Sequence, residues 1–178
     1  MISDFVKGKK KLDYSAGIQQ GISLHRAIDE FTDNHPANKE AKNVFKSVYG
    51  LYAGAFVDVT YDHFLANDTR EFSSASALES FSFSMYTILN EYYTILPDTF
   101  KRMLPHMQRY NWLYHYRSEN GIQQSYGGLV QRAKYLKDSL PAGELLKTNY
   151  SLLQHCYDEF FPQLKRYVLH QLSGPKGA

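Results

Sequence analysis

Acidic and imidazole side chains recur every four residues in segment 24–33, which reads L-H-R-A-I-D-E-F-T-D. Because a helix turns by about 100° per residue, His25, Asp29 and Asp33 would form one narrow row along this segment. Leu24 and Ile28 fall beside that row as part of an apolar stripe. The row is therefore expected to border buried surface, where imidazole and carboxylate groups can bind a metal ion or transfer protons.

The same spacing returns in segment 55–65, A-F-V-D-V-T-Y-D-H-F-L, where Asp62 follows Asp58 by four residues and His63 comes next. The remaining residues are apolar almost all round, which is typical of an internal helix. Buried carboxylates are costly unless they are paired or bound to a cation. Two histidines and up to four aspartates on two helices therefore suggest a metal centre.

A simpler interpretation stays open. Single aspartates and histidines on helices are commonly solvated, used as caps or paired with cations, and Arg26, Lys39 and Lys42 are available as partners. The run D-N-H-P at 33–36 is typical of one helix ending and another beginning. Spacing by itself does not decide between these interpretations, although three acids inside apolar helices call for a common explanation.

Length and composition restrict the class of protein. The chain has 178 residues, which we assign to one domain over residues 1–172 and a disordered tail over 173–178. Charged residues make up 21% and the net charge is +2, so no strong field favours nucleic acid. The single cysteine, Cys156, excludes an intramolecular disulfide. Because the sequence shows no long apolar run and no signal peptide, it predicts a soluble, cytoplasmic protein without a membrane partner.

The elements that must position the acidic rows are predicted to be helices joined by short connections. They are expected at 15–33, 36–49, 51–66, 78–96, 100–108, 112–117, 122–136 and 144–172. Gly50 and Gly121 should end helices, Pro105 and Pro162 should kink or split them, and 139–143 should form a loop. Alternating strand patterns are essentially absent, so the predicted class is all-α, a single-domain helical bundle.

Several motifs give the chain a resemblance to a known family. They read D-F-V-K-G at 4–8, G-I-S-L-H-R-A-I-D-E-F-T-D-N-H-P at 21–36 and D-V-T-Y-D-H-F-L at 58–65, with a weaker aromatic and apolar piece over 110–133. In this order they resemble the acyl carrier protein phosphodiesterase family, which is similar to the histidine–aspartate phosphohydrolases, a group of all-α metal enzymes. Family members usually begin with a further helix that carries an Asn-Phe-Leu-Ala-His type motif. This sequence starts after that segment, so a ligand supplied there would be missing from the metal shell.

The resemblance implies hydrolysis of the phosphodiester that joins 4′-phosphopantetheine to a serine of holo-acyl carrier protein. It also implies a divalent cation, with Mn²⁺ favoured and Mg²⁺ as the alternative, since a carboxylate-rich set without thiolate suits these ions better than structural Zn²⁺. Carried over residue by residue, it assigns the metal ligands Asp4, His25, Asp62 and His63 and the catalytic residues Asp29 and Asp58. Asp58 is an alternative ligand to His63, and Asp29 would act as general base or orient a ligand.

The implied substrate also directs attention to basic residues. Acyl carrier proteins are acidic, so a cationic surface near the site would favour docking. The candidates are Arg26, Lys39, Lys42, Lys46, Arg109 and Arg117, and Arg132 lies in the same aromatic motif region as the last two. Lys39, Lys42 and Lys46 share one helical face, which is equally typical of an ordinary solvated surface. The tyrosine-rich segment 110–116 would line a channel for the pantetheine arm or simply belong to the core.

Two functions of other kinds stay open. One is a metal-dependent nucleotide phosphohydrolase, and the other is a helical interaction module without catalytic activity. Metal analysis would separate the interaction module from both enzymes. Conversion of holo- to apo-carrier protein would separate the two enzymes from each other.

Overall fold

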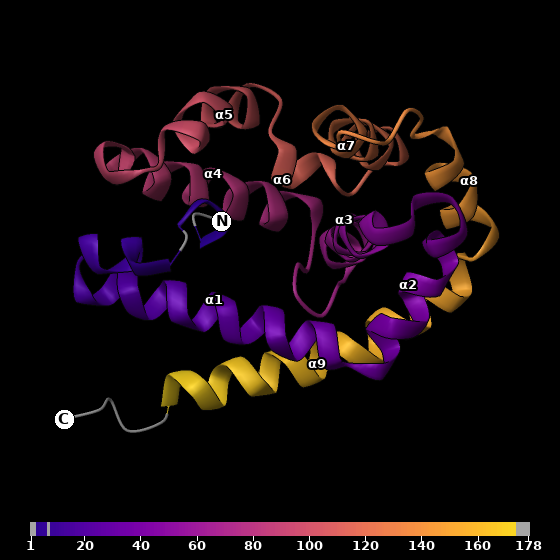
Figure 1. Ribbon diagram of the computed structural model, residues 1–178, viewed down its shortest axis with the longest axis horizontal. Helices are drawn as coiled ribbons and strands as arrows, with labels where there is room; N and C mark the ends of the chain where they lie inside the picture. The colour runs from indigo at the N-terminus through magenta and orange to yellow at the C-terminus, as the bar shows by residue number, and fades with distance from the viewer. Residues whose placement is uncertain (1–2, 7, 174–178) are drawn as a thin grey trace.

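The computed structural model describes residues 3–6 and 8–173, and within these ranges the chain forms helices and no strand (Figure 1). The α-helices are α1 (Ala16–Asn34), α2 (Pro36–Tyr49), α3 (Ala53–Asn67), α4 (Ala75–Glu91), α5 (Asp98–Arg109), α6 (Trp112–His115), α7 (Glu119–Arg132), α8 (Leu140–Thr148) and α9 (Tyr150–Ser173). Short 3₁₀ helices occupy η1 (Ser3–Phe5), η2 (Gly8–Asp13), η3 (Gly50–Tyr52) and η4 (Tyr93–Ile95). The predicted all-α class is confirmed. Residues 174–178, most of the predicted tail, lie outside the described ranges.

Helix α3 lies in the middle of the larger of two hydrophobic cores (Figure 1). Its Phe56 and Val57 side chains are fully buried, and α2, α7, α8 and α9 contribute the rest of this core. Tyr49 stacks on Phe56 with ring centroids 3.8 Å apart, and the Thr60 and Tyr126 hydroxyls form a buried hydrogen bond of 2.6 Å. The apolar pattern of segment 55–65 therefore reflects an internal helix, as predicted.

A smaller core joins α4, α5 and α6 and lies above α1 in the view of Figure 1. Its buried members are Tyr86, Leu96, Phe100, Leu104 and Met107. The backbone N–H of Leu113 donates to the Tyr86 hydroxyl and ties α6 to α4. The space between this core and the larger one is where the candidate site lies.

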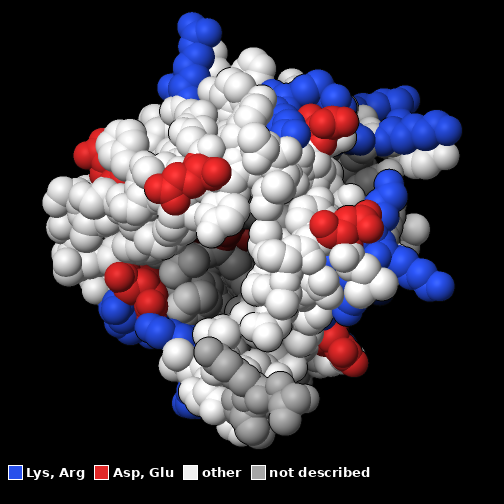
Figure 2. Space-filling model, turned by 90° about the vertical axis from the view of Figure 1, so that its left-hand side faces the viewer, with Lys and Arg blue, Asp and Glu red and all other residues white. Residues whose placement is uncertain are grey.

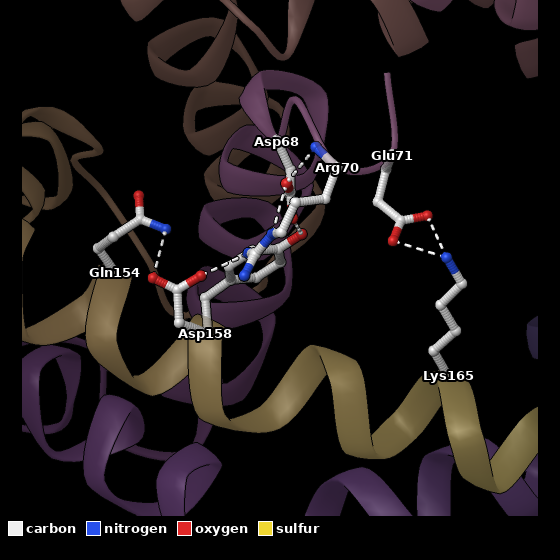
Figure 3. Close-up of polar contacts among 7 residues, drawn as sticks. Asp68, Arg70, Glu71, Gln154, Asp158 and Lys165 are labelled. Carbon is white, nitrogen blue, oxygen red and sulfur yellow. Dashed lines mark hydrogen bonds and ion pairs between the residues drawn. The ribbon is translucent and has the colours of Figure 1, made fainter. Parts of the chain in front are cut away.

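The connection after α3 is fastened to α9 by polar contacts (Figure 3). The Asp68 side chain is only 5% exposed and accepts from the Tyr157 hydroxyl at 3.0 Å and from the Arg70 guanidinium at 2.8 Å. Arg70 also pairs with Asp158 on α9. These contacts hold the end of α3 against α9.

Most helices occur where periodicity predicts them, and Pro36 and Gly50 bound α2 as expected. Helices α5 and α9 continue through Pro105 and Pro162, so the prediction that these prolines split or interrupt their helices is wrong, while a kink at Pro105 stays a prediction. The break in the C-terminal region falls instead at Asn149, whose side-chain amide and backbone N–H both donate to the Leu145 carbonyl.

Two glycine- and proline-containing segments also differ from prediction. The expected loop over 139–143 is the start of α8, because Pro141 lies in the first helical turn, where no intrahelical N–H donor is required. Gly121 does not end a helix but lies in the first turn of α7, where its N–H donates to the Ser118 side chain. A Cβ at position 121 would collide with the backbone carbonyl of His115, so glycine permits the close turn from α6 into α7.

Candidate active site

A cavity of about 1050 Å³ lies between the two cores. Its walls come from α1, α3, α5, α6, α7 and α9 and from Phe5 in η1. His25 and Asp29 of α1 and Asp58 and Asp62 of α3 all line it. The face drawn in Figure 2 is hollowed, and an acidic residue is visible in the depth of the hollow. The structure therefore brings residues of both predicted rows to one cavity.

The α1 wall presents an imidazole held by a carboxylate. The His25 Nδ1 atom lies 3.1 Å from Asp29 Oδ2, one helical turn further along α1. When Nδ1–H donates to Asp29, the lone pair is on Nε2, which is the form that binds metals or accepts protons. Asp33, the third member of the row, does not line the cavity and instead forms an ion pair of 2.7 Å with Lys42.

The α3 wall presents two neighbouring carboxyl groups. Burial, followed by the charge of Asp58, raises the pKa of Asp62 to about 7, and a hydrogen bond donated by the Tyr116 hydroxyl opposes this increase. The cause is physical: a second negative charge beside a desolvated carboxylate disfavours ionisation. A positive charge between the two carboxylates would favour the ionised form of Asp62 instead.

His63 does not join this group, although it follows Asp62 directly in sequence. Its side chain is 7% exposed, and its Nδ1 lies 2.7 Å from the Tyr116 carbonyl, to which it donates. It lines a separate cavity of about 680 Å³ together with Asn67 and Arg117. Asp4 lies in η1, which packs against α1, but its side chain is outside the described part of the structure.

The residue types on the two walls suit a hard divalent cation, which prefers carboxylate oxygen and tolerates imidazole. Among the side chains that the structure describes, which leave out that of Asp4, no three of His, Cys, Asp or Glu form a group that could by itself hold a metal ion. The chemistry of His25, Asp58 and Asp62 therefore fits a cation, while a complete ligand set is not assembled by the described side chains.

The sequence places the chain among known proteins. A family model described as acyl carrier protein phosphodiesterase matches residues 1–164. The chain belongs to the acyl carrier protein phosphodiesterase family.

Relatives with that name share about three residues in ten with this chain. The one from Klebsiella pneumoniae subsp. pneumoniae is 31% identical over 169 residues, covering 93% of this chain and 86% of its own. The one from Enterobacter sp. strain 638 is 30% identical over 167 residues, covering 92% and 85%. The one from Escherichia coli O139:H28 is 29% identical over 175 residues, covering 96% and 89%. No solved structure gives a significant match.

Of the basic residues named for docking a partner, all but Arg132 lie outside the main cavity of this family member. Arg26 donates to the Val6 carbonyl, Lys42 pairs with Asp33, and Arg117 donates to the Tyr114 hydroxyl. Lys39, Lys46 and Arg109 likewise do not line it. Among the described residues, the lysine or arginine side chains that do line the cavity are Arg102 and Arg132.

Tyr116 is the site residue that the spacing argument missed. It lies between α6 and α7, its hydroxyl donates to Asp62, and its carbonyl accepts from His63. Of the tyrosines in segment 110–116, Tyr116 lines the cavity while Tyr110 and Tyr114 do not, so the channel role of this segment stays a prediction. The sequence shows the run of aromatic residues, but it does not indicate which of their rings lies beside an aspartate.

Proposed function

We propose that this chain hydrolyses the phosphodiester between 4′-phosphopantetheine and the serine of holo-acyl carrier protein, with a divalent cation bound in the main cavity. The names of its relatives support the substrate. The observation that carries the proposal is the convergence of His25 and Asp29 with Asp58 and Asp62 on one cavity from two separate helices. A cavity of about 1050 Å³ also has room for a small organic arm.

His25 and Asp62 would contribute ligands to the cation, Mn²⁺ or Mg²⁺, and any contribution of Asp4 is to be tested. When bound, it would neutralise phosphoryl charge and lower the pKa of a coordinated water. The carboxyl pair of Asp58 and Asp62 supports this placement, because their mutual repulsion and burial favour a positive charge between them.

The protein's own groups have distinct tasks in this reaction. Asp29 holds the His25 imidazole in one orientation through the Nδ1 contact. Asp58 is the more exposed carboxylate and accepts the proton of the attacking water. Water oxygen then bonds to phosphorus, the bond from phosphorus to the serine oxygen breaks, and that oxygen takes a proton from solvent. The apolar wall of Phe100, Met103 and Trp112 excludes water around the pantetheine arm.

A mass measurement tests this proposal directly. The chain is incubated with holo-carrier protein and Mn²⁺, with and without a chelator, and the carrier is examined by mass spectrometry. We expect loss of one phosphopantetheine group in the presence of Mn²⁺ and none with chelator. His25→Ala and Asp62→Ala should each abolish the conversion, because each removes a proposed metal ligand.

Asp33→Ala is the matched control, because Asp33 belongs to the same helical row but points to Lys42 instead of the cavity. We expect its activity to stay within about twofold of wild type. Conversion that survives Asp62→Ala, or that ignores the chelator, would contradict the metal assignment. Hydrolysis of nucleotides with no action on holo-carrier protein would favour the nucleotide phosphohydrolase instead.

Docking of the acidic carrier onto basic residues remains part of the proposal. Lys39 and Lys46 are exposed on α2 and do not line the cavity, so their role depends on contacts of the carrier's body and not of its prosthetic arm. Replacement of both by glutamate should raise the KM for holo-carrier protein and weaken its salt dependence.

The described helices include none that is long and apolar enough to cross a membrane. We propose a cytoplasmic location, where the buried thiol of Cys156 would stay reduced.

A further inference from the structure

Arg132 lies where two cavities share a wall. It is the last residue of α7 and lines both the main cavity and a second one of about 750 Å³ beside α7. Trp112 and Tyr116 are the other residues common to both cavities. The two spaces are thus separated by a guanidinium group and two aromatic side chains.

The guanidinium of Arg132 lies close enough to Tyr116 to act electrostatically on its hydroxyl. Its charge lowers the pKa of the Tyr116 hydroxyl, against the larger upward effect of burial, and this hydroxyl donates to Asp62. Arg132 is exposed and forms no ion pair with the acids of the described ranges. Since three carboxylates line the main cavity, an anionic substrate there needs an opposing positive charge from the protein.

Gly128 of α7 lies beside this guanidinium. Gly121, Gly127 and Gly128 all line the second cavity, and a Cβ at position 128 would be 3.5 Å from Arg132 Nη1. The guanidinium therefore lies back along α7, beside Gly128. The metal hypothesis gives the G-I-Q-Q-S-Y-G-G-L segment no function, whereas two successive glycines beside a cation in a cavity wall allow close approach of a ligand.

We propose that Arg132 binds the phosphoryl group of the substrate at the junction of the two cavities. The inference rests on the proposed function and deepens it: the diester has two arms, and the junction offers one cavity to each. A planar guanidinium with five N–H donors matches a phosphoryl group, which accepts two parallel hydrogen bonds from it. Arg102 lines the main cavity as well, but its guanidinium donates to Thr99 at 3.3 Å, within its own helix α5.

Binding of the reaction product tests the role of Arg132 without requiring catalysis. Titration calorimetry of the full chain with 4′-phosphopantetheine gives Kd for wild type, Arg132→Ala, Arg132→Lys and Lys134→Ala. Lys134→Ala is the matched control, because it removes one positive charge two residues away, at an exposed position outside both cavities. Pantetheine without phosphate is the matched ligand.

We expect Arg132→Ala to raise the Kd for phosphopantetheine roughly 10- to 100-fold, as for loss of a charge-assisted phosphate contact. Arg132→Lys should fall in between, and Lys134→Ala should stay within about twofold of wild type. Affinity for pantetheine should be the same in wild type and Arg132→Ala. Equal phosphopantetheine affinities in wild type and Arg132→Ala would overturn the inference, and so would equal losses in Arg132→Ala and Lys134→Ala.

The failure of this inference differs from failure of the proposed function. If wild type converts holo- to apo-carrier protein and Arg132→Ala does so with unchanged KM and kcat, the phosphodiesterase stands and the role of Arg132 is refuted. If wild type neither cleaves the carrier nor binds phosphopantetheine, both are refuted. Because Arg132 is exposed, its substitution should leave the circular dichroism spectrum and the melting temperature unchanged, which confirms that a loss of binding is local.

Discussion

Replacement of Asp68 by alanine should destabilise the protein by about 2 to 3 kcal/mol. The carboxylate is 5% exposed and accepts from the Tyr157 hydroxyl, and Tyr157 itself is 1% exposed. Without Asp68 this hydroxyl is buried with no acceptor, and an unsatisfied buried donor costs about 1 to 3 kcal/mol. Loss of the bond from the Arg70 backbone N–H, 2.9 Å long, adds to that cost.

The assay is urea unfolding followed by circular dichroism, with the free energy of unfolding extrapolated to water. For a chain of this length, 2 to 3 kcal/mol corresponds to a decrease in melting temperature of roughly 4 to 12 °C. Asp158→Ala serves as the control, because it breaks the other ion pair of Arg70 between exposed side chains. Its effect should be much smaller, since such pairs are screened by solvent.

A double-mutant cycle isolates the buried hydroxyl. Tyr157→Phe in the Asp68→Ala background removes the unsatisfied donor, so the double variant should be less destabilised than the sum of the single changes by about 1 kcal/mol. The reasoning would be refuted if Asp68→Ala cost no more than Asp158→Ala. It would also be refuted if the two changes at positions 68 and 157 were additive.

Three further predictions follow from the same structure. The Arg70 guanidinium lowers the pKa of Asp68 in the folded protein. The stabilisation from Asp68 should therefore be complete above about pH 4, where the carboxyl of the unfolded chain ionises, and should vanish as the pH falls through the lower pKa of the folded state. The urea midpoints of wild type and Asp68→Asn should converge at acidic pH, and a constant difference would contradict this prediction. Gly121→Ala should destabilise the protein by about 1 to 3 kcal/mol, because the added Cβ collides with the His115 carbonyl. Gly17→Ala should instead stabilise α1 by about 0.5 to 1 kcal/mol, because a Cβ there meets no atom within 4 Å. Equal shifts in the melting temperatures of the two variants would argue against both predictions. Asp62→Asn should raise the Mn²⁺ concentration for half-maximal activity roughly tenfold or more, measured by metal titration of carrier hydrolysis, and an unchanged titration would remove Asp62 from the ligand set.

The helices themselves were largely predictable, because their signals are local. Apolar residues at helical spacing, Pro36 in a first turn and Gly50 with a positive φ of 53° mark α2 without reference to the rest of the fold. The same local signals misled at Pro141, since a proline begins a helix as readily as it ends one. Gly121 misled for another reason: its role is a close approach to His115, which depends on how α6 meets α7.

Within one helix, spacing also identified which acidic residues lie together, but it could not say which side of the helix faces the cavity. Asp62 and His63 are adjacent, yet about 100° of rotation separates their side chains. Asp62 consequently reaches the main cavity while His63 faces another one, towards Asn67. Asp33 shares its row with Asp29 but extends beyond the cavity to Lys42.

Contacts between helices depend on how the helices pack, and the spacing of residues within one helix does not predict this packing. Tyr116 donates to Asp62 and Arg132 borders the same cavity, although they come from segments more than fifty residues further along the chain. What brings them there is the packing of α3 against α7 around Phe56 and Tyr126, whose rings lie 5.4 Å apart. The buried aromatic core therefore determines that Arg132 and the acids of α3 line the same cavity. A cavity-forming change such as Tyr126→Ala should accordingly weaken phosphopantetheine binding without removing any group that contacts the ligand.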